Sequence, residues 1–196
     1  CSLVGSEMCI RDSYYREDQE ESHDEKVVLS VKDLCTDKLK DVSFELHAGE
    51  ILGVCGLSDG GIHDLGRTLF AKEKIRKGQI VIHTSKGEKV VKKSRDLINN
   101  HGAYLSKDRD SEGLMLQASV ALNLQVPSLK MLAGPLGFVN PKRERKMAQN
   151  AKEAFEIKCE SIDAPVNSMS GGNKQKVNLS RWLLKSLDFI ILDCPT

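Results

Sequence analysis

The stretch that decides the fold is GEILGVCGLSDGGIHDLGRTLFA, Gly49 to Ala71. It begins with an aliphatic run, continues into a glycine-rich loop and ends in a helical pattern. In that pattern Ile62, Leu65 and Leu69 recur at spacings of three and four. Chains that bind a phosphate at a helix N-terminus are commonly built in this order. The stretch therefore predicts an α/β fold with a phosphate-binding loop.

The register of this loop decides which side chains would meet a phosphate. A loop of the form G-x-x-x-x-G-K-[ST] cradles phosphates with glycine amides, and adds a lysine for charge and a hydroxyl for Mg²⁺. In one register Gly56 and Gly61 frame the loop, and Ile62 and His63 then take the lysine and hydroxyl positions. In the other register Gly61 and Gly66 frame it. We prefer the first, because the apolar run ends at Gly56 and we expect it to be a buried central strand.

In the preferred register the loop lacks both the ammonium and the metal-binding hydroxyl. A charge-assisted hydrogen bond is worth about 1.5 to 3 kcal/mol, so nucleotide would bind more weakly, through backbone amides and the helix N-terminus. Asp59 adds a negative charge beside the phosphates. On this stretch alone, a tight turn without a ligand is the alternative. The candidate nucleotide-binding residues are Gly56, Leu57, Ser58, Asp59, Gly60, Gly61, Ile62 and His63.

The composition excludes several classes of function. The chain has 196 residues, a formal net charge of +1 and 5% aromatic residues, so nothing favours a nucleic-acid partner. No apolar run approaches the roughly 20 residues that cross a bilayer, and the N-terminus lacks a secretory signal pattern. The six cysteines form no C-x-x-C pair, which indicates free thiols in a reducing compartment. We therefore expect a cytoplasmic location.

The two ends of the chain differ from its middle. Residues 1–13, CSLVGSEMCIRDS, fit nothing downstream and resemble a translated sequencing adapter, so we expect a non-native segment. Residues 14–26 are highly charged, as a solvated linker would be. We expect the ordered domain to span 27–196 and to be cut at its C-terminus, because the chain stops after the apolar strand DFIILDCPT.

The middle of the chain alternates strand and helix patterns. We expect antiparallel strands at VVLSVKDL (27–34) and DVSFELH (41–47), a further pair around Gly87, and a buried strand at GAYLS (102–106). Ser94 is a candidate N-cap for a short helix at SRDLINN (94–100). A surface helix rich in charge is expected over 141–155, starting at a proline. The basic run KVVKKSR (89–95) fits a solvated strand edge.

A second motif lies near the C-terminus, in MSGGNKQKV (169–177). Ser170 and two glycines precede a helix, and such a start presents N–H groups and about half a positive charge to an anion. The strand FIILD then brings Asp193 to its carboxyl end, where an acidic residue can reach a Mg²⁺ shell. The apolar positions expected to share a buried face of the helix are Val177, Leu179, Trp182, Leu183 and Leu184.

Together these motifs resemble the ATP-binding cassette (ABC) family, in particular the second of two fused cassettes in bacterial importers of ribose, galactose and xylose. The segments that carry the resemblance are GEILGVCGLSDGG, GAYLSKDRDSEGL, MSGGNKQKV and FIILDCPT. The resemblance runs from about residue 27 to 196. It implies a P-loop NTPase-like α/β cassette with an antiparallel β subdomain and a helical subdomain at about 114–155. GLMLQASVALNL (113–124) would then either contact a permease or fill the interior of the helical subdomain.

The resemblance also implies a role for each motif. The segment MSGGNKQKV would be the signature motif of the family, and it would contact the γ-phosphate of ATP held by a partner cassette fused upstream. Asp193 would hold Mg²⁺, weakly or not at all, in this cassette's own site. The signature residues would be Ser170, Gly171, Gly172, Asn173 and Gln175.

Three departures from the family pattern weaken this cassette's own site. Ile62 and His63 replace the loop's lysine and hydroxyl, and Lys107 stands where the family's first cassette carries a metal-sensing glutamine. Cys194 stands where the catalytic glutamate is expected, and general-base help is worth about 10² to 10⁴ in rate. No self-sufficient catalytic residue is therefore expected. For Cys194 we favour a buried inert thiol over a redox switch.

The sequence leaves two functions open. The first is the ATP-binding component of a carbohydrate importer at the cytoplasmic face of the plasma membrane. Its signature would complete the ATP site of a partner cassette, and its further partners would be a transmembrane sugar permease and a periplasmic or extracellular sugar-binding protein. The alternative is a non-catalytic nucleotide-binding or scaffold module that stabilises a cassette dimer. A free-standing P-loop kinase or GTPase is disfavoured, because such enzymes do not need the SGGN helix.

Overall fold

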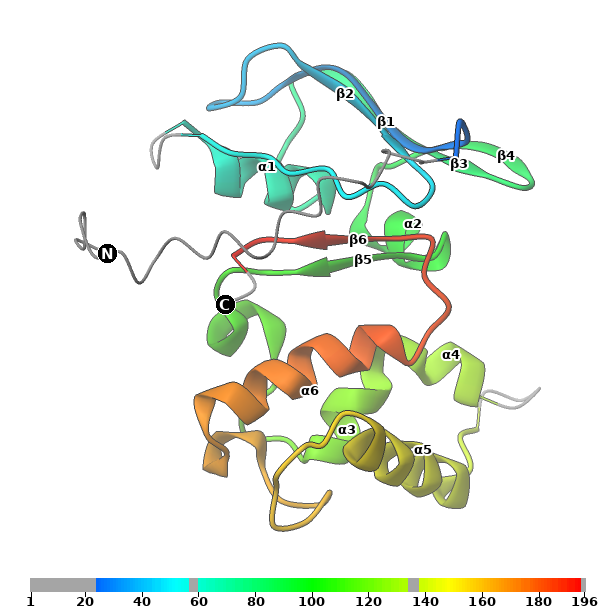
Figure 1. The fold of residues 1–196 in the computed structure, drawn as a ribbon, viewed down its shortest axis with the longest axis vertical. Helices are drawn as coiled ribbons and strands as arrows, with labels where there is room; N and C mark the ends of the chain where they lie inside the picture. The colour runs from blue at the N-terminus through cyan, green and yellow to red at the C-terminus, as the bar shows by residue number, and fades with distance from the viewer. Residues whose placement is uncertain (1–23, 57–59, 134–137, 195–196) are drawn as a thin grey trace, which may run out of the picture.

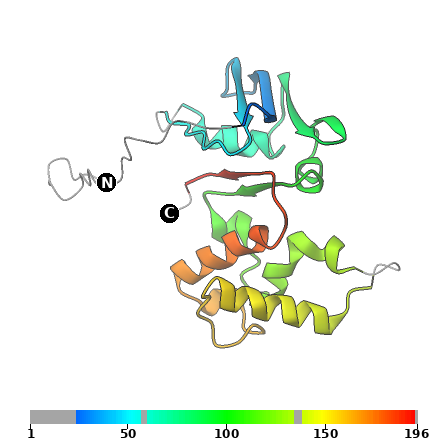
Figure 2. The same cartoon turned by 45° about the vertical axis from the view of Figure 1, so that its right-hand side comes forward.

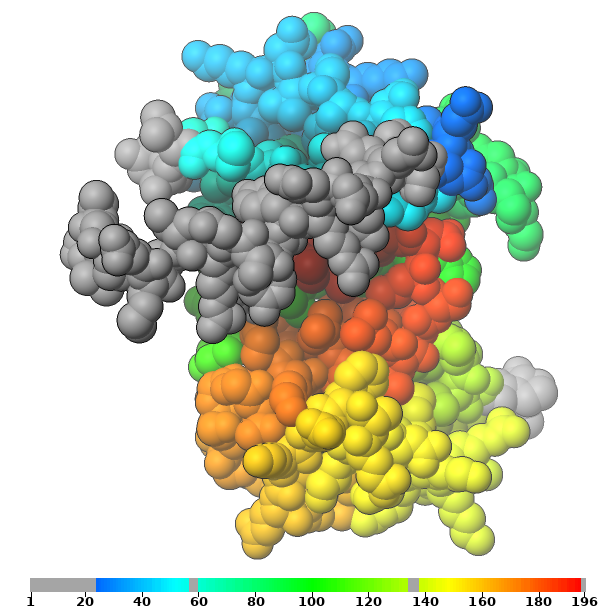
Figure 3. All heavy atoms as spheres, in the orientation of Figure 1, coloured from blue at the N-terminus to red at the C-terminus, as the bar shows by residue number. Residues whose placement is uncertain are grey.

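The computed structural model describes residues 24–56, 60–133 and 138–194. The expected non-native segment 1–13 and most of the expected linker 14–26 lie outside the described residues, as do Leu57, Ser58 and Asp59. The described chain forms three layers, namely an antiparallel sheet with one helix against it, a parallel strand pair, and a group of helices (Figure 1, Figure 2). As spheres, the strands near the N-terminus gather at one end and the yellow and orange helical residues at the other (Figure 3).

The first layer is the antiparallel sheet, with strand order β2-β1-β3-β4. Its strands are β1 (Val27–Cys35), β2 (Val42–His47), β3 (Lys77–Thr84) and β4 (Gly87–Val90). Leu29, Val31, Ile80 and Ile82 are almost fully buried and form the inner face of the two central strands. β4 is the edge strand and exposes Lys89, as the sequence predicts for a charged edge that resists pairing with another chain.

The second layer is a parallel pair of strands that sets the position of the site. Its elements and their neighbours are α1 (Ile62–Leu69), α2 (Ser94–Asn99), β5 (Gly102–Leu105) and β6 (Phe189–Leu192). Gly102 lies opposite Phe189 and Leu105 opposite Leu192, in parallel register. Because parallel strands end at the same edge, the segments after β5 and β6 emerge side by side.

Three aromatic side chains join this layer to its neighbours. The rings of Phe70, after α1, and Tyr104, on β5, stack with centroids 5.0 Å apart. Trp182 meets Phe70 edge-on at 6.4 Å, and it is buried, as the sequence predicts. The end of α1, strand β5 and the helix carrying Trp182 therefore share one core.

The third layer is helical and has a core of its own. Its elements are η3 (Arg109–Gly113, a π-helical turn), α3 (Val120–Gln125), η4 (Val126–Ser128), α4 (Leu129–Leu132), α5 (Pro141–Ala154), η5 (Val166–Ser168) and α6 (Gly171–Leu183). Val120, Leu124, Ala148 and Val177 are fully buried where α3, α5 and α6 meet. α5 begins at its proline, with the Asn140 side chain accepting a hydrogen bond from the backbone N–H of Lys142 at 2.9 Å. Within the described residues, no helix is long and apolar enough to cross a membrane.

One predicted strand is wrong. We expected 51–56 to form a buried central strand, but the segment is extended and joins no strand ladder among the described residues. Ile51 is 97% exposed and Val54 50% exposed, and the segment borders a hollow of about 960 Å³ that is also lined by β6. An apolar run reports a preference for burial, but a strand also needs a neighbour for its backbone hydrogen bonds.

Three smaller expectations also fail. Leu183 is 45% exposed, because it lies six positions after Val177 and so points about 240° away around the helix. Lys93, and not Ser94, is the N-cap of α2, since the carboxylate of Asp96 accepts hydrogen bonds from the N–H groups just before the helix. Cys194 is exposed and not buried, because it follows the end of β6 in a left-handed backbone conformation, φ 48°.

Candidate functional site

The helix that follows the glycine loop starts where the preferred register requires. Gly61 is the N-cap of α1 with φ 82°, a left-handed conformation that favours glycine, and the helix begins at Ile62. His63 therefore lies in the first turn, where backbone N–H groups have no partner within the helix. The loop residues before it, Leu57 to Asp59, are outside the described part of the chain.

His63 and Asp193, which the sequence places in separate motifs, are in direct contact. His63 Nδ1 lies 2.7 Å from Asp193 Oδ1, and Lys107 Nζ lies 3.0 Å from His63 Nε2. The Tyr104 hydroxyl donates to Asp193 Oδ2 at 3.3 Å. His63 of the glycine loop, Lys107 and Asp193 are therefore linked, with Tyr104, in one series of hydrogen bonds, which we call the polar chain. Tyr104 was not predicted as a site residue, and its place on a buried strand parallel to β6 was the signal.

The close approach of α1 to the strand pair makes these contacts possible. A Cβ atom at Gly66 would lie 3.3 Å from Tyr104 Cε2 and 3.6 Å from Asp193 Oδ2. Such spacing leaves little room for a side chain, so Gly66 lets the helix pack directly on the ends of β5 and β6. The second register would have used Gly66 to frame a phosphate loop, but here Gly66 lies within α1.

Burial keeps the hydroxyl group of Tyr104 protonated. Desolvation raises the pKa of Tyr104 far above its usual value, and the negative charge of Asp193 raises it further. Its hydroxyl therefore keeps its proton and donates to the carboxylate at neutral pH. The Asp193 side chain is only 9% exposed, that of His63 is 31% exposed and Lys107 is exposed, so solvent reaches these hydrogen-bonded residues from the side of His63 and Lys107.

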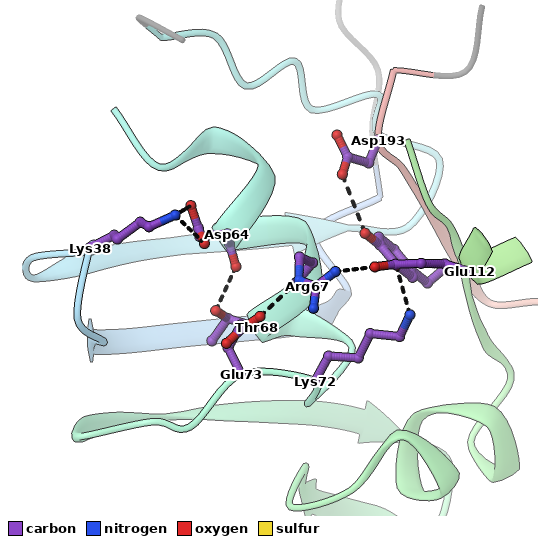
Figure 4. Close-up of polar contacts among 9 residues, drawn as sticks. Lys38, Asp64, Arg67, Thr68, Lys72, Glu73, Glu112 and Asp193 are labelled. Atoms are coloured by element: carbon purple, nitrogen blue, oxygen red, sulfur yellow. Dashed lines mark hydrogen bonds and ion pairs between the residues drawn. The ribbon is translucent and has the colours of Figure 1, made fainter. Parts of the chain in front are cut away.

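A second polar cluster ties α1 to the turn η3. Figure 4 shows Glu112 directed towards Arg67 and Lys72 on one side of Asp193. Glu112 pairs with Arg67 and accepts a hydrogen bond from Lys72 at 2.8 Å, and Arg67 also donates to Glu73 at 2.8 Å. Hydrogen bonding to Lys72 holds the pKa of Glu112 below its ordinary value, against the opposing effect of burial. This ion cluster, Arg67–Lys72–Glu73–Glu112, was not predicted from the sequence.

The first residues of α6 are exposed to solvent, whereas at the start of α1 Gly61 is buried and His63 contacts Asp193. Ser170 is the N-cap, and Ser170, Gly171 and Gly172 are all exposed. Asn173 fixes the cap, because its Nδ2 donates to Ser170 Oγ at 2.9 Å while its Oδ1 accepts from the backbone N–H of Lys158 at 2.8 Å.

An arginine borders this open helix start. Arg109 Nη1 lies 3.5 Å from Gln175 Oε1, and a Cβ atom on Gly171 would lie 3.0 Å from Arg109 Nη2. The helix start therefore faces solvent with a guanidinium beside it, and Arg109 is a residue of this region that the sequence alone did not single out.

Three potential metal ligands meet at the carboxyl end of β6. One ligand atom from each of His63, Asp193 and Cys194 lies within 4.8 Å of the others. Mg²⁺ prefers oxygen ligands in octahedral geometry, and of these three residues only Asp193 supplies oxygen. Both of its oxygens already accept hydrogen bonds, from His63 and Tyr104.

The antiparallel sheet, the parallel strand pair and the helical layer together form the α/β fold of an ATP-binding cassette. The family model described as ABC transporter matches residues 39–196, so the chain belongs to the ABC transporter family.

Curated relatives agree with this assignment. The ribose import ATP-binding protein RbsA 2 of Rhizobium meliloti (strain 1021) is 37% identical over 171 residues, which cover 86% of this chain and 32% of that protein. The ribose import ATP-binding protein RbsA of Ruegeria sp. (strain TM1040) is 35% identical over 197 residues, which cover 100% of this chain and 38% of that protein. The chain thus spans about a third of the length of these relatives.

Solved structures show the same fold. A nucleotide-free ATP-binding cassette from an ABC transporter matches with a TM-score of 0.67 at 16% identity, over 87% of this chain and 70% of that one. A dimeric cassette in a post-hydrolysis state bound to ADP and Pi matches with a TM-score of 0.68 at 17% identity, over 86% of this chain and 74% of that one. The predicted fold class, an α/β ABC cassette with an antiparallel sheet and a helical part, is confirmed.

Proposed function

We propose that this chain is a cassette of the ATP-binding component of a sugar importer, and that its signature completes the ATP site of a partner cassette. Two relatives are named as ribose import ATP-binding proteins, and the chain matches a third of each of them. In this proposal ATP is the energy source, and the partners are a cassette fused upstream, a transmembrane sugar permease and a sugar-binding protein. The component works at the cytoplasmic face of the membrane.

The observation that carries the proposal is the contrast between the two helix starts. The start of α6 exposes Ser170 and two glycines, which leaves their N–H groups accessible to a phosphate from another chain or domain. The start of α1 has Ile62 and His63 where a phosphate loop would have lysine and a hydroxyl, and His63 is engaged with Asp193. We infer that the cassette's own site binds ATP and Mg²⁺ weakly and hydrolyses ATP inefficiently.

The proposal is tested by Ser170→Arg in the full-length protein that carries this cassette. A long cationic side chain at the N-cap would fill the open helix start and displace the phosphate. We expect ATPase activity to fall by about 10²-fold or more, the usual cost of losing one preorganised electrostatic donor. The matched control is Ser186→Arg, which places the same charge on an exposed position beyond the other end of α6 and should leave turnover unchanged.

Two outcomes would contradict this function. Turnover that survives Ser170→Arg would show that the signature is not used. A full-length protein without any turnover would favour the scaffold function, in which the cassette only stabilises a dimer. Sequencing the coding region on both sides of this chain is the companion test, since the proposal needs an upstream cassette with an intact loop lysine and catalytic glutamate.

A further inference from the structure

The polar chain at the end of β6 has a defined direction. An ammonium group has only donors, so Lys107 Nζ donates to His63 Nε2, 3.0 Å away. A neutral imidazole that accepts at Nε2 carries its proton on Nδ1, which then donates to Asp193 Oδ1 at 2.7 Å. With Tyr104 donating to Oδ2, both oxygens of Asp193 are occupied by side chains of the same cassette.

These contacts orient the carboxylate of Asp193 towards hydrogen-bond donors. A magnesium shell requires the carboxylate to face the ion or the waters of the ion. Here the carboxylate faces an imidazole and a phenol, and the remaining potential ligand of the cluster is the thiol of Cys194. The residues present therefore do not fit Mg²⁺.

Lys107 differs from the other cations around α1. Lys38 pairs with Asp64, and Arg67 and Lys72 pair with Glu112. Among the described residues, Lys107 contacts the imidazole of His63 and pairs with no carboxylate. Its positive charge is not cancelled by direct pairing, and its exposed side chain can reach an incoming anion.

We propose that Lys107, held by His63 above Asp193, is the built-in cation of this site, so that the site binds a nucleoside triphosphate in its metal-free form. Lys107 supplies the charge that the loop lacks at Ile62 and that Mg²⁺ would supply next to Asp193. The N-terminus of α1 provides backbone N–H groups to the same phosphates. The inference rests on the proposed function only in taking this site as a nucleotide site.

The test is a titration of the full-length protein with a fluorescent ATP analogue, in excess EDTA and in excess Mg²⁺. The signature-dependent site is first blocked by removing the loop lysine of the partner cassette, so that the signal comes from this cassette. We expect binding in EDTA at least as tight as in Mg²⁺. Lys107→Met should weaken binding in EDTA about tenfold or more, the cost of one charge-assisted hydrogen bond.

The matched control is Lys89→Met, which removes an exposed lysine from the edge strand β4 and should leave the affinity unchanged. Binding that appears only with Mg²⁺, or that is insensitive to Lys107→Met, overturns the inference. Absence of binding in both buffers overturns it as well. None of these results bears on the proposed role of the signature in the partner's ATP site, which is tested separately by turnover in Ser170→Arg.

Discussion

The N-termini of α1 and α6 both present unpaired backbone N–H groups, but different side chains surround them. Each begins with a glycine-rich segment and directs unpaired N–H groups away from the helix. At α1, His63 and Asp193 close a hydrogen-bonded chain with Lys107 and Tyr104. At α6, Ser170 and the two glycines face solvent. The start of α6 is therefore open to a second molecule directly, whereas a phosphate that reaches the start of α1 also meets His63 and Lys107 of the same cassette.

The support behind each helix start differs as well. α1 has eight residues and is tied to the turn η3 by the ion cluster of Arg67, Lys72, Glu73 and Glu112. α6 has thirteen residues and is anchored by buried Val177 and Trp182 in two different cores. Both helices rest on buried apolar side chains, Leu65 and Leu69 in α1 and Val177 and Trp182 in α6, and α1 has the ion cluster in addition.

The largest expected effect reverses the metal preference of the closed start. In the double variant His63→Ser with Lys107→Gln, oxygen ligands replace the imidazole and the ammonium, and one oxygen of Asp193 becomes free. We expect the ATP analogue to bind at least about tenfold more tightly with Mg²⁺ than in EDTA, because Mg²⁺ prefers oxygen ligands. The measurement is the two-buffer titration, and an affinity that still ignores Mg²⁺ would show that these side chains do not decide the metal preference.

A smaller effect is expected at the open start. Asn173→Ala removes the hydrogen bond that holds Ser170 Oγ and the one that Lys158 donates from its backbone. We expect the turnover of the full-length protein to fall about fivefold, which corresponds to one net hydrogen bond. Asn167→Ala, an exposed asparagine just before the same helix, is the control. Equal turnover in the two variants would mean that Asn173 does not position the cap.

The smallest effect concerns the charges behind the closed start. Glu112→Gln should lower the free energy of unfolding by about 1 kcal/mol at neutral pH, the upper range for partly exposed ion pairs. Because the folded state lowers the pKa of Glu112, its contribution is present above the ordinary value of 4.5 and is lost as the pH falls through the folded pKa. Urea denaturation at pH 7 and below pH 4.5 measures this.

The wild type and Glu112→Gln should therefore converge in stability in acid. Glu160→Gln, an exposed carboxylate on the helical layer, serves as the control and should match the wild type at both pH values. A constant difference between wild type and Glu112→Gln across this pH range would assign the effect to packing and not to charge.

Much of the architecture could be predicted from local patterns. The alternation in β1 and β2, the proline start of α5 and the serine cap of α6 each act within a few residues, so the sequence reports them directly. Segment 51–56 could not be predicted correctly, because its state depends on a neighbouring strand and not on its own apolar character.

The sequence predicted several residues of the candidate site but not the hydrogen bonds between them. The motifs named His63, Lys107 and Asp193, but no spacing in the sequence tells that one imidazole lies between the other two groups. Tyr104 and Glu112 lie in the segment GAYLSKDRDSEGL, but within it only Lys107 was assigned a role, so these two residues were missed. Their roles arise from the parallel register of β5 and β6 and from the close approach at Gly66.

The aromatic contact between Phe70 and Trp182 provides an intrinsic fluorescence probe between α1 and α6. Trp182 is the single tryptophan of the chain, so its emission is not mixed with that of another indole. It sits on α6, edge-on to the ring that ends α1, with the guanidinium of Arg181 5.3 Å from its ring. Any rearrangement that separates the closed helix start from the helix of the open one changes the surroundings of this indole. Intrinsic fluorescence, without a label, can therefore follow whether the two halves of the cassette move together.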